Sequence, residues 1–216
     1  LLDEVFKYFP EENYQDYDDE FIKVAVIGKP NAGKSSLINR IAGEERVIVS
    51  NIAGTTRDAT DTVIENENGK YVFIDTAGIR KKSKVNEKIE HFSVLRAYMA
   101  VDRADVCVIV IDAEVGFTEQ DSKIAGYAHE QGKASIIAVN KWDAIEKNDN
   151  TMKEFQTKLE NDFSFMSYVP FVFISAKTGQ RVNKLFEMIN YVNEQNCMRI
   201  STGTLNDVLS YATTRV

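Results

Sequence analysis

A glycine-rich segment, GKPNAGKSS, has the residue types and spacing of a phosphate-binding loop. Gly28 is followed after four residues by Gly33, Lys34 and Ser35, between an apolar run and a helical pattern. The glycines let successive backbone N–H groups point into one concavity, and the following helix adds the positive end of its dipole. We expect Lys34 to bind the terminal phosphates of a nucleoside triphosphate and Ser35 Oγ to bind Mg²⁺. A chance glycine turn is the alternative, but it does not explain the whole motif in this context. The predicted contacts are Gly28, Lys29, Pro30, Asn31, Ala32, Gly33, Lys34, Ser35 and Ser36.

The choice of base is predicted by the segment NKWD, which directly follows the apolar run SIIAV. Guanine presents N1–H and an exocyclic amine side by side, and the Asp143 carboxylate can accept from both. Adenine lacks that amine and would leave the carboxylate unpaired. A polar turn that opens the next helix is the alternative interpretation. The motif SAK is a weak signal by itself, but its position after the run FVFI predicts a second base-contacting loop. These two loops comprise Asn140, Lys141, Trp142, Asp143, Ser175, Ala176 and Lys177.

The segment DTAGI, at the end of another predicted strand, matches the second phosphate-side motif. Asp75 would hold a water on Mg²⁺, and the Gly78 N–H would reach the γ-phosphate. In the long loop before it, Thr55 or Thr56 is the candidate that closes on Mg²⁺, and we favour Thr56. The predicted metal ligands are therefore Ser35, Thr56 and Asp75. The predicted nucleotide contacts also include Asp75, Thr76, Ala77, Gly78 and Ile79.

Hydrolysis poses a separate problem, because Ile79 stands where many regulatory GTPases carry a glutamine that orients the attacking water. An isoleucine side chain cannot do this. The residues expected to serve catalysis are Lys34, Thr56, Gly78 and Asn31, the last through the potassium route described below.

The elements that must position these loops alternate along the chain between strands and helices. Strands buried on both faces predict an α/β fold: a three-layer P-loop NTPase with a mostly parallel six-stranded sheet and one antiparallel edge strand. The segment 44–60 is expected to be a long connection. Strands are predicted at 22–27, 61–65, 70–74, 106–111, 135–139 and 171–174, and helices at 34–42, 87–101, 118–131, 150–163 and 181–193.

Composition suggests one α/β domain with additional segments at both ends. The net charge of −7 arises in residues 1–20, which hold eight acids and one base, while the rest of the chain holds 25 of each. A sequence pI of about 5.0 therefore does not exclude an RNA partner.

We expect an acidic linker in 1–20, a nucleotide-binding domain in 21–195 and the truncated start of another domain in 196–216, with a strand at 198–201 and a helix at 204–213. The chain starts with Leu and is interpreted as a fragment. No stretch approaches a membrane span, and Cys107 is expected to be a buried thiol in a reducing cytoplasm.

Several stretches together resemble the second GTP-binding domain of the Der (EngA) family of bacterial ribosome-assembly GTPases. They span most of residues 21–145. GTTRD narrows the resemblance to the branch that also contains Era and MnmE, and GIRKKSKV with the SVLRA helix indicates Der. The stretches are GKPNAGKSSL, GEERVIVSNIAGTTRD, DTAGIRKKSKV, FSVLRAYMAVDRADV, EQDSKIAGYAHEQGK and NKWD.

This resemblance implies GTP/GDP and Mg²⁺ as ligands and a cytoplasmic role in maturing the large ribosomal subunit. It also implies that residues 1–20 include the end of an upstream G domain, and that 196–216 begin a KH-like domain. Both domains would be partners within the same chain, along with ribosomal RNA and proteins. Neither a membrane nor DNA is expected as a partner. In MnmE-like proteins the asparagine that matches Asn31 binds K⁺, which implies K⁺-stimulated hydrolysis; the alternative is that Asn31 only stabilises the turn.

Three functions remain to be compared. A GTP-hydrolysing switch is favoured by intact Lys34, Ser35, Thr56 and Asp75. A module that binds GDP or GTP without hydrolysing it is the alternative, and a metabolic P-loop kinase is disfavoured by NKWD and by the lack of a lid segment. The basic run Arg80, Lys81, Lys82 and Lys84 is predicted to contact RNA or a neighbouring domain in one nucleotide state, unless it is simply a solvated loop.

Overall fold

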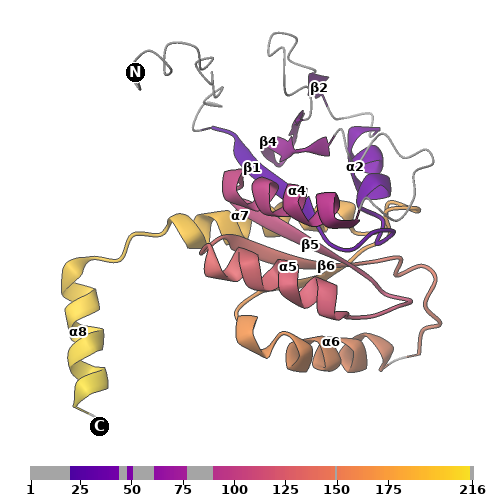
Figure 1. The fold of residues 1–216 in the computed structure, drawn as a ribbon. Helices are drawn as coiled ribbons and strands as arrows, with labels where there is room; N and C mark the ends of the chain where they lie inside the picture. The colour runs from indigo at the N-terminus through magenta and orange to yellow at the C-terminus, as the bar shows by residue number, and fades with distance from the viewer. Residues whose placement is uncertain (1–19, 44–47, 51–60, 77–89, 149, 215–216) are drawn as a thin grey trace, which may run out of the picture.

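The fold is built on one twisted sheet whose central strands are parallel (Figure 1). The computed structural model describes residues 20–43, 48–50, 61–76, 90–148 and 150–214. Strand order is β2-β3-β4-β1-β5-β6-β7. The strands are β1 (Ile22–Ile27), β2 (Ile48–Ser50), β3 (Thr62–Asn66), β4 (Gly69–Ile74), β5 (Val106–Asp112), β6 (Ala134–Asn140) and β7 (Phe171–Phe173). The helices are α2 (Lys34–Ala42), α4 (Glu90–Arg103), α5 (Glu119–Glu130), α6 (Thr151–Asp162), α7 (Val182–Cys197) and α8 (Thr202–Thr213), with a 3₁₀ turn at Ser164–Met166.

The central strands are apolar throughout because both faces of the sheet are covered. Alternate side chains enter two separate cores: Val108 and Val110 lie in one, and Cys107, Ile109 and Ile111 in the other. The first core also contains buried residues of α2 and α7, and the second those of α4, α5 and α6. The predicted three-layer arrangement is therefore confirmed. Cys107 is a buried free thiol, and burial raises its pKa to about 12.

The predicted α/β fold with a mostly parallel sheet is confirmed, but one strand was not predicted. Within the described residues the sheet has seven strands, because Ile48–Ser50 pairs antiparallel with β3 inside the segment expected to be a connection. Strand β3 is antiparallel to β4 as predicted, but β2 takes the edge position. A three-residue strand is too short to show the alternation by which strands are recognised in a sequence. The predicted hairpin of β3 and β4 is confirmed.

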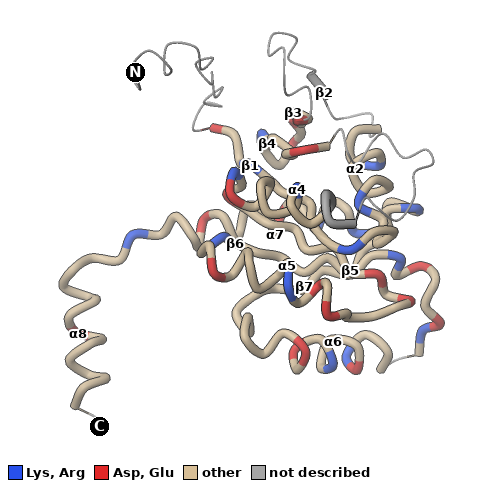
Figure 2. The backbone as a smooth tube through the Cα atoms, viewed as in Figure 1, with Lys and Arg blue, Asp and Glu red and all other residues tan. Residues whose placement is uncertain are grey.

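Two helices have ends that the sequence predicts well. Thr118 caps α5 in a capping box with Asp121, and Gly132 follows the helix in the left-handed conformation at φ 64°. Helix α6 begins at Thr151, close to the expected residue 150. It buries Leu159 and exposes acidic and basic residues along its outer face (Figure 2).

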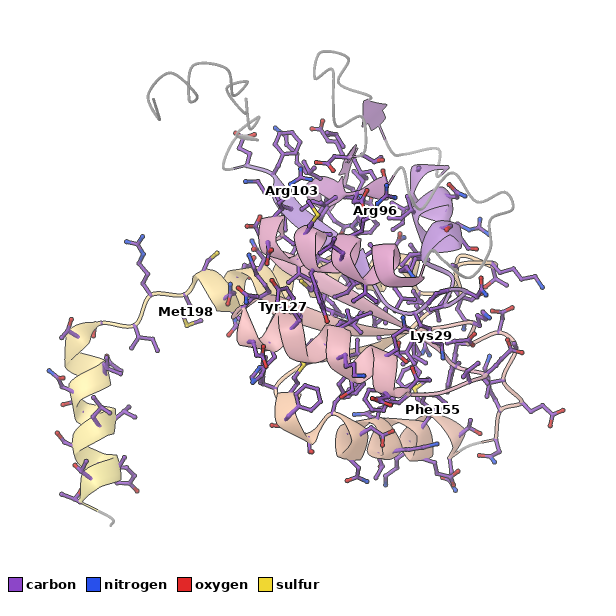
Figure 3. The ribbon with its side chains drawn as sticks, viewed as in Figure 1. Lys29, Arg96, Arg103, Tyr127, Phe155 and Met198 are labelled. Atoms are coloured by element: carbon purple, nitrogen blue, oxygen red, sulfur yellow. The ribbon has the colours of Figure 1, made fainter. Side chains whose placement is uncertain are left out.

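The carboxyl-terminal segment differs from its prediction. Residues 198–201 form no strand; helix α7 extends to Cys197, and Ser201 then caps α8 by accepting a hydrogen bond from the Thr204 N–H at 3.1 Å. The expected strand would have needed a partner, and in the structure this segment is an exposed connection that carries Met198 (Figure 3). Helix α8 has no buried residue and stands away from the rest of the chain (Figure 1).

Some sequence predictions fall outside the described ranges and stay predictions. They concern most of the acidic linker, the loop at 51–60 and the basic run after residue 79. Within the part of the chain that the structure describes, no helix has both the length and the apolar character needed to cross a bilayer.

Candidate nucleotide-binding site

The four predicted loops meet at one edge of the sheet. Strands β4, β1, β5, β6 and β7 run parallel, so their carboxyl ends lie together. Each predicted loop begins at one of these ends. Ligands of open α/β sheets bind in the crevice at this edge.

The phosphate loop requires glycine at two positions. Gly28 has φ 138°, and a Cβ there would lie 2.4 Å from the Val110 backbone oxygen; Gly33 has φ 96°, and its Cβ would lie 2.0 Å from Asn140 Nδ2. Gly33 is also the N-cap of α2 and provides no capping side chain. The first turn of α2 therefore presents N–H groups that an anion can accept.

The Lys34 ammonium lies over this loop. Its Nζ donates to the backbone oxygens of Gly28 at 2.6 Å and Lys29 at 2.7 Å. The charge is thus held beside the backbone of the loop. Binding of the phosphates by Lys34 stays a prediction. Lys29, labelled in Figure 3, extends to the loop after β5, where its Nζ donates to the Gly116 oxygen at 3.4 Å.

Asn140 joins the phosphate loop to the base loop. It is 2% exposed, its Nδ2 donates to the Ala32 oxygen at 2.9 Å, and its Oδ1 accepts from the Ala176 N–H at 2.9 Å. Both bonds are buried, so the amide has no water to replace them. Two loops 108 and 36 residues away from Asn140 are thereby fixed relative to one another.

Asp143 lies partly exposed beside the second base loop. A hydrogen bond from the Ser175 side chain, followed by smaller effects that include nearby Lys177 and Lys147, lowers the pKa of the Asp143 carboxyl below its ordinary value. Ser175 itself is fully buried. The side chain at 143 is consequently an oriented carboxylate, which is the group that guanine's two adjacent donors require.

The other two residues of NKWD support the loop in different ways. Lys141 has φ 62°, and its Nζ bonds Asp112 Oδ2 at 2.6 Å, a contact that raises the lysine pKa. Trp142 is 2% exposed and packs against Phe173 and Phe155 in the core, with centroids 4.5 and 5.6 Å away. The Trp142 side chain packs into the core and thereby anchors the loop. It faces away from the base, which it was predicted to contact. Phe155 is labelled in Figure 3.

Asp75 directly follows β4 and has a left-handed conformation, with φ 52°. Its N–H donates to Asp61 Oδ1 at 2.9 Å, and Asp61 Oδ2 accepts from Arg103 of α4 at 2.5 Å (Figure 3). Thr76, the next residue, is buried, with its hydroxyl 2.6 Å from that of Thr62. The backbone of the predicted metal residue is thus held by the start of β3 and the end of α4.

Some of the remaining predicted site residues lie within the described ranges, and others lie outside them. Asn31 is exposed with φ 65°, and Ser35 and Ser36 lie in the first turn of α2. Thr55, Thr56, Ala77, Gly78 and Ile79 lie outside the described residues.

The donor set at this edge fits a hard divalent cation. Ser35 lies in the first turn of α2, and Asp75 directly follows β4. Hydroxyl and carboxylate oxygens are the ligands that Mg²⁺ prefers. In the described part of the chain, no cluster of three or more His, Cys, Asp or Glu residues forms a separate metal site.

Three supporting residues were missed by sequence reasoning. Asp112, which holds Lys141, lies opposite Asn140 in the register of β5 and β6, so its position at a strand end was an available signal. For Asp61 and Arg40, the sequence contains no comparable signal of a supporting role. Arg40 lies on α2 and bonds the base loop from 136 residues away.

Comparison with known proteins agrees with this geometry. Residues 23–141 match the model of the 50S ribosome-binding GTPase family. The chain is 65% identical over its full length to GTPase Der of Acetivibrio thermocellus and 61% identical to GTPase Der of Ruminiclostridium cellulolyticum. It spans about half the length of these curated relatives, 49% of each.

A solved structure of Era in complex with MgGDPNP and a segment of 16S ribosomal RNA has a similar fold. The TM-score is 0.59 and the identity 28%, over 80% of this chain and 57% of that one. From the family match, which covers the phosphate loop and reaches into the base loop, the chain belongs to the 50S ribosome-binding GTPase family.

Proposed function

We propose that this chain is a GTP-binding and GTP-hydrolysing switch domain that acts with the large ribosomal subunit. The observation that carries the proposal is the pair of hydrogen bonds made by the Asn140 side chain, which hold the phosphate loop at Ala32 and the base loop at Ala176. One ligand with phosphates at one end and a base at the other would fit between them. The Asp143 carboxylate supports guanine as that base.

In this mechanism the chain's own groups mainly bind and orient. The Lys34 ammonium and the N–H groups at the start of α2 would neutralise charge on the phosphate oxygens, while Asp143 fixes the base. Ser35, Asp75 and the predicted Thr56 would hold Mg²⁺, which supplies positive charge beside the β- and γ-phosphates when it is bound. Ile79 provides no group to orient water, so hydrolysis needs another source of positive charge.

We assign that role to K⁺ held through Asn31. The exposed side chain and left-handed backbone of Asn31 place an amide on the phosphate loop three residues before Lys34. An amide oxygen is a hard ligand that suits an alkali cation. The larger, more weakly hydrated K⁺ would be accepted in preference to Na⁺.

A comparison of salts tests both hydrolysis and its cation. Phosphate release from GTP in Mg²⁺ should be faster in KCl than in NaCl at equal ionic strength, and Asn31→Ala should remove the difference. Asn39→Ala, an exposed asparagine on α2, serves as the control. Equal rates in both salts would refute the role of K⁺. Tight GTP binding with no phosphate release in either salt would instead favour a module that only binds the nucleotide.

The ribosomal role and the domain layout are also proposals. They are supported by the 50S ribosome-binding family and by relatives named GTPase Der. Era was solved with 16S ribosomal RNA, from the small subunit, and supports a ribosomal role in general. Helix α8 exposes Leu205, Val208 and Leu209, as expected of a segment that belongs to a following domain. We therefore keep residues 21–195 as the GTP-binding domain and 196–216 as the start of a KH-like domain.

A further inference from the structure

Arg40 connects the helix that follows the phosphate loop to the loop that faces the base. It lies in the last turn of α2 and is half-buried. Its Nε donates to the Ala176 oxygen at 3.2 Å, and its second terminal nitrogen donates to the Lys177 oxygen. One planar guanidinium thus holds two consecutive carbonyls, which a single lysine ammonium does not match in geometry.

The guanidinium also lies close to a glycine of this loop. Gly179 has φ 84°, and a Cβ built there would lie 3.6 Å from Arg40 Cζ and 3.7 Å from its Nε. The arginine therefore packs over the turn as well as bonding it. The same turn is closed by the Gly179 N–H, which donates to the Ser175 oxygen at 2.8 Å.

Ala176 is held from two sides. Its N–H donates to Asn140 Oδ1, and its carbonyl accepts from Arg40 Nε. Asn140 in turn donates to Ala32, which lies just before α2. The two ends of α2 are consequently tied to one residue of the base loop, through Asn140 at the start of the helix and directly through Arg40 at its end.

We propose that Arg40 is a positioning residue for guanine recognition, a role that rests on the proposed function. Arg40 fixes the 175–177 loop, and this loop contains Ser175, which bonds the Asp143 carboxylate. Arg40 acts through these residues and is not itself a base contact. Without it, the carbonyls of Ala176 and Lys177 lose a charged donor, and the loop keeps the Asn140 bond on its other side.

The base-dependent part of binding should then weaken most. Guanine offers Asp143 two donors, whereas hypoxanthine lacks the exocyclic amine and offers one. If the Asp143 carboxylate is less precisely positioned, the chain should therefore lose more affinity for GDP than for inosine diphosphate. A variant that was only less stable as a whole would lose affinity for both nucleotides by the same factor.

The experiment measures affinities of GDP and inosine diphosphate, with Mg²⁺, for the wild-type chain, Arg40→Lys and Arg40→Gln. Arg199→Gln, an exposed arginine on the connection between α7 and α8, is the matched control. GDP affinity of Arg40→Gln should fall about tenfold, chiefly through faster dissociation, and its preference for GDP over inosine diphosphate should fall about threefold, as expected from the loss of charge-assisted hydrogen bonds. For Arg40→Lys, both the GDP affinity and the preference for GDP should lie between those of Arg40→Gln and the wild type. Arg199→Gln should match the wild type in both.

Two results would overturn the role of Arg40: unchanged GDP affinity in Arg40→Gln, or an equal factor lost for both nucleotides. Thermal unfolding without nucleotide reports whether the glutamine variant is folded; if it is not, the same ratio in Arg40→Lys decides the question. A wild-type chain that does not bind GDP would instead overturn the proposed function, and this inference with it.

Discussion

At the scale of single residues, the proposed recognition of guanine depends on one carboxylate and its orientation. Asp143 receives the Ser175 hydrogen bond, and the backbone N–H of Trp142 donates to the Ile174 oxygen at 3.1 Å. The neighbouring indole is buried among Phe155 and Phe173, which fixes the loop from the core side. In the proposed function, selectivity for guanine therefore resides in Asp143, and the surrounding residues determine where its oxygens point.

Asp143→Asn should separate these roles. The change replaces one acceptor with an amide donor that faces guanine's donors, so GDP affinity should fall by roughly 10²-fold, as for other mispaired buried polar groups. A calorimetric titration with GDP measures this. Asp207→Asn, on exposed α8, is the control and should bind normally. If Asp143→Asn binds GDP as the wild type does, this carboxylate does not contact the base.

The acid limit of binding follows from the lowered pKa of Asp143. Because its folded pKa lies below the ordinary value, the carboxylate stays charged as the pH falls through the usual carboxyl range, and its contribution is lost only when the pH falls through the lowered pKa. Ser175→Ala removes the largest cause of this shift. Loss of GDP affinity in acid should therefore begin at a higher pH in Ser175→Ala than in the wild type.

The measurement is the dissociation constant of GDP as a function of pH, with circular dichroism at each pH to show that both proteins stay folded. If GDP affinity falls over the same acidic pH range in Ser175→Ala and in the wild type, the Ser175 hydrogen bond does not control the charge of Asp143.

At the scale of elements, the caps and strand ends determine where the loops begin. Helix α5 starts after the loop that follows β5, and its first turn contains the reciprocal bonds of Thr118 and Asp121. Asp121 is fully buried; Oδ2 accepts from the Thr118 N–H at 3.1 Å and its hydroxyl at 2.6 Å, and Oδ1 has no partner within the described residues. The cap thus also provides hydrogen bonds to a buried acidic side chain.

Thr118→Ala should consequently destabilise the fold more than an exposed cap would. The expected loss is about 2 kcal/mol, the upper part of the range for helix caps, because a buried carboxylate loses a donor. The free energy of unfolding in urea measures it. Ser201→Ala removes the cap of α8, which buries no residue, and should change this free energy little. Equal losses in the two variants would contradict the special role given to the Asp121 carboxylate.

At the scale of the whole molecule, the sequence predicts what is encoded locally and misses what depends on distant partners. The apolar strands, the hairpin and the order of strand, glycine-rich loop and helix each have a local signal, and the structure contains all of them. Binding of phosphate by the loop stays a prediction. Strand β2 has three residues and is defined by its pairing with β3, so no local pattern identifies it. Residues 198–201 have a strand-like composition but gain no neighbouring strand.

The same reason explains the missed parts of the site. Arg40 bonds carbonyls 136 and 137 residues away, and the Asp61 side chain bonds the backbone of residue 75 and Arg103. Such contacts exist only after the sheet has brought its carboxyl ends together. Residue types and spacing identified the groups expected to contact the ligand, and the fold identified the groups that hold them.

If the loops at this edge form one guanine-nucleotide site, titrating the chain with GDP and with ADP in the presence of Mg²⁺ should show it. We expect saturable binding of one GDP per chain and at least 10²-fold weaker binding of ADP, because adenine has no donors that match Asp143. No binding of GDP, or equal affinity for the two nucleotides, would contradict it.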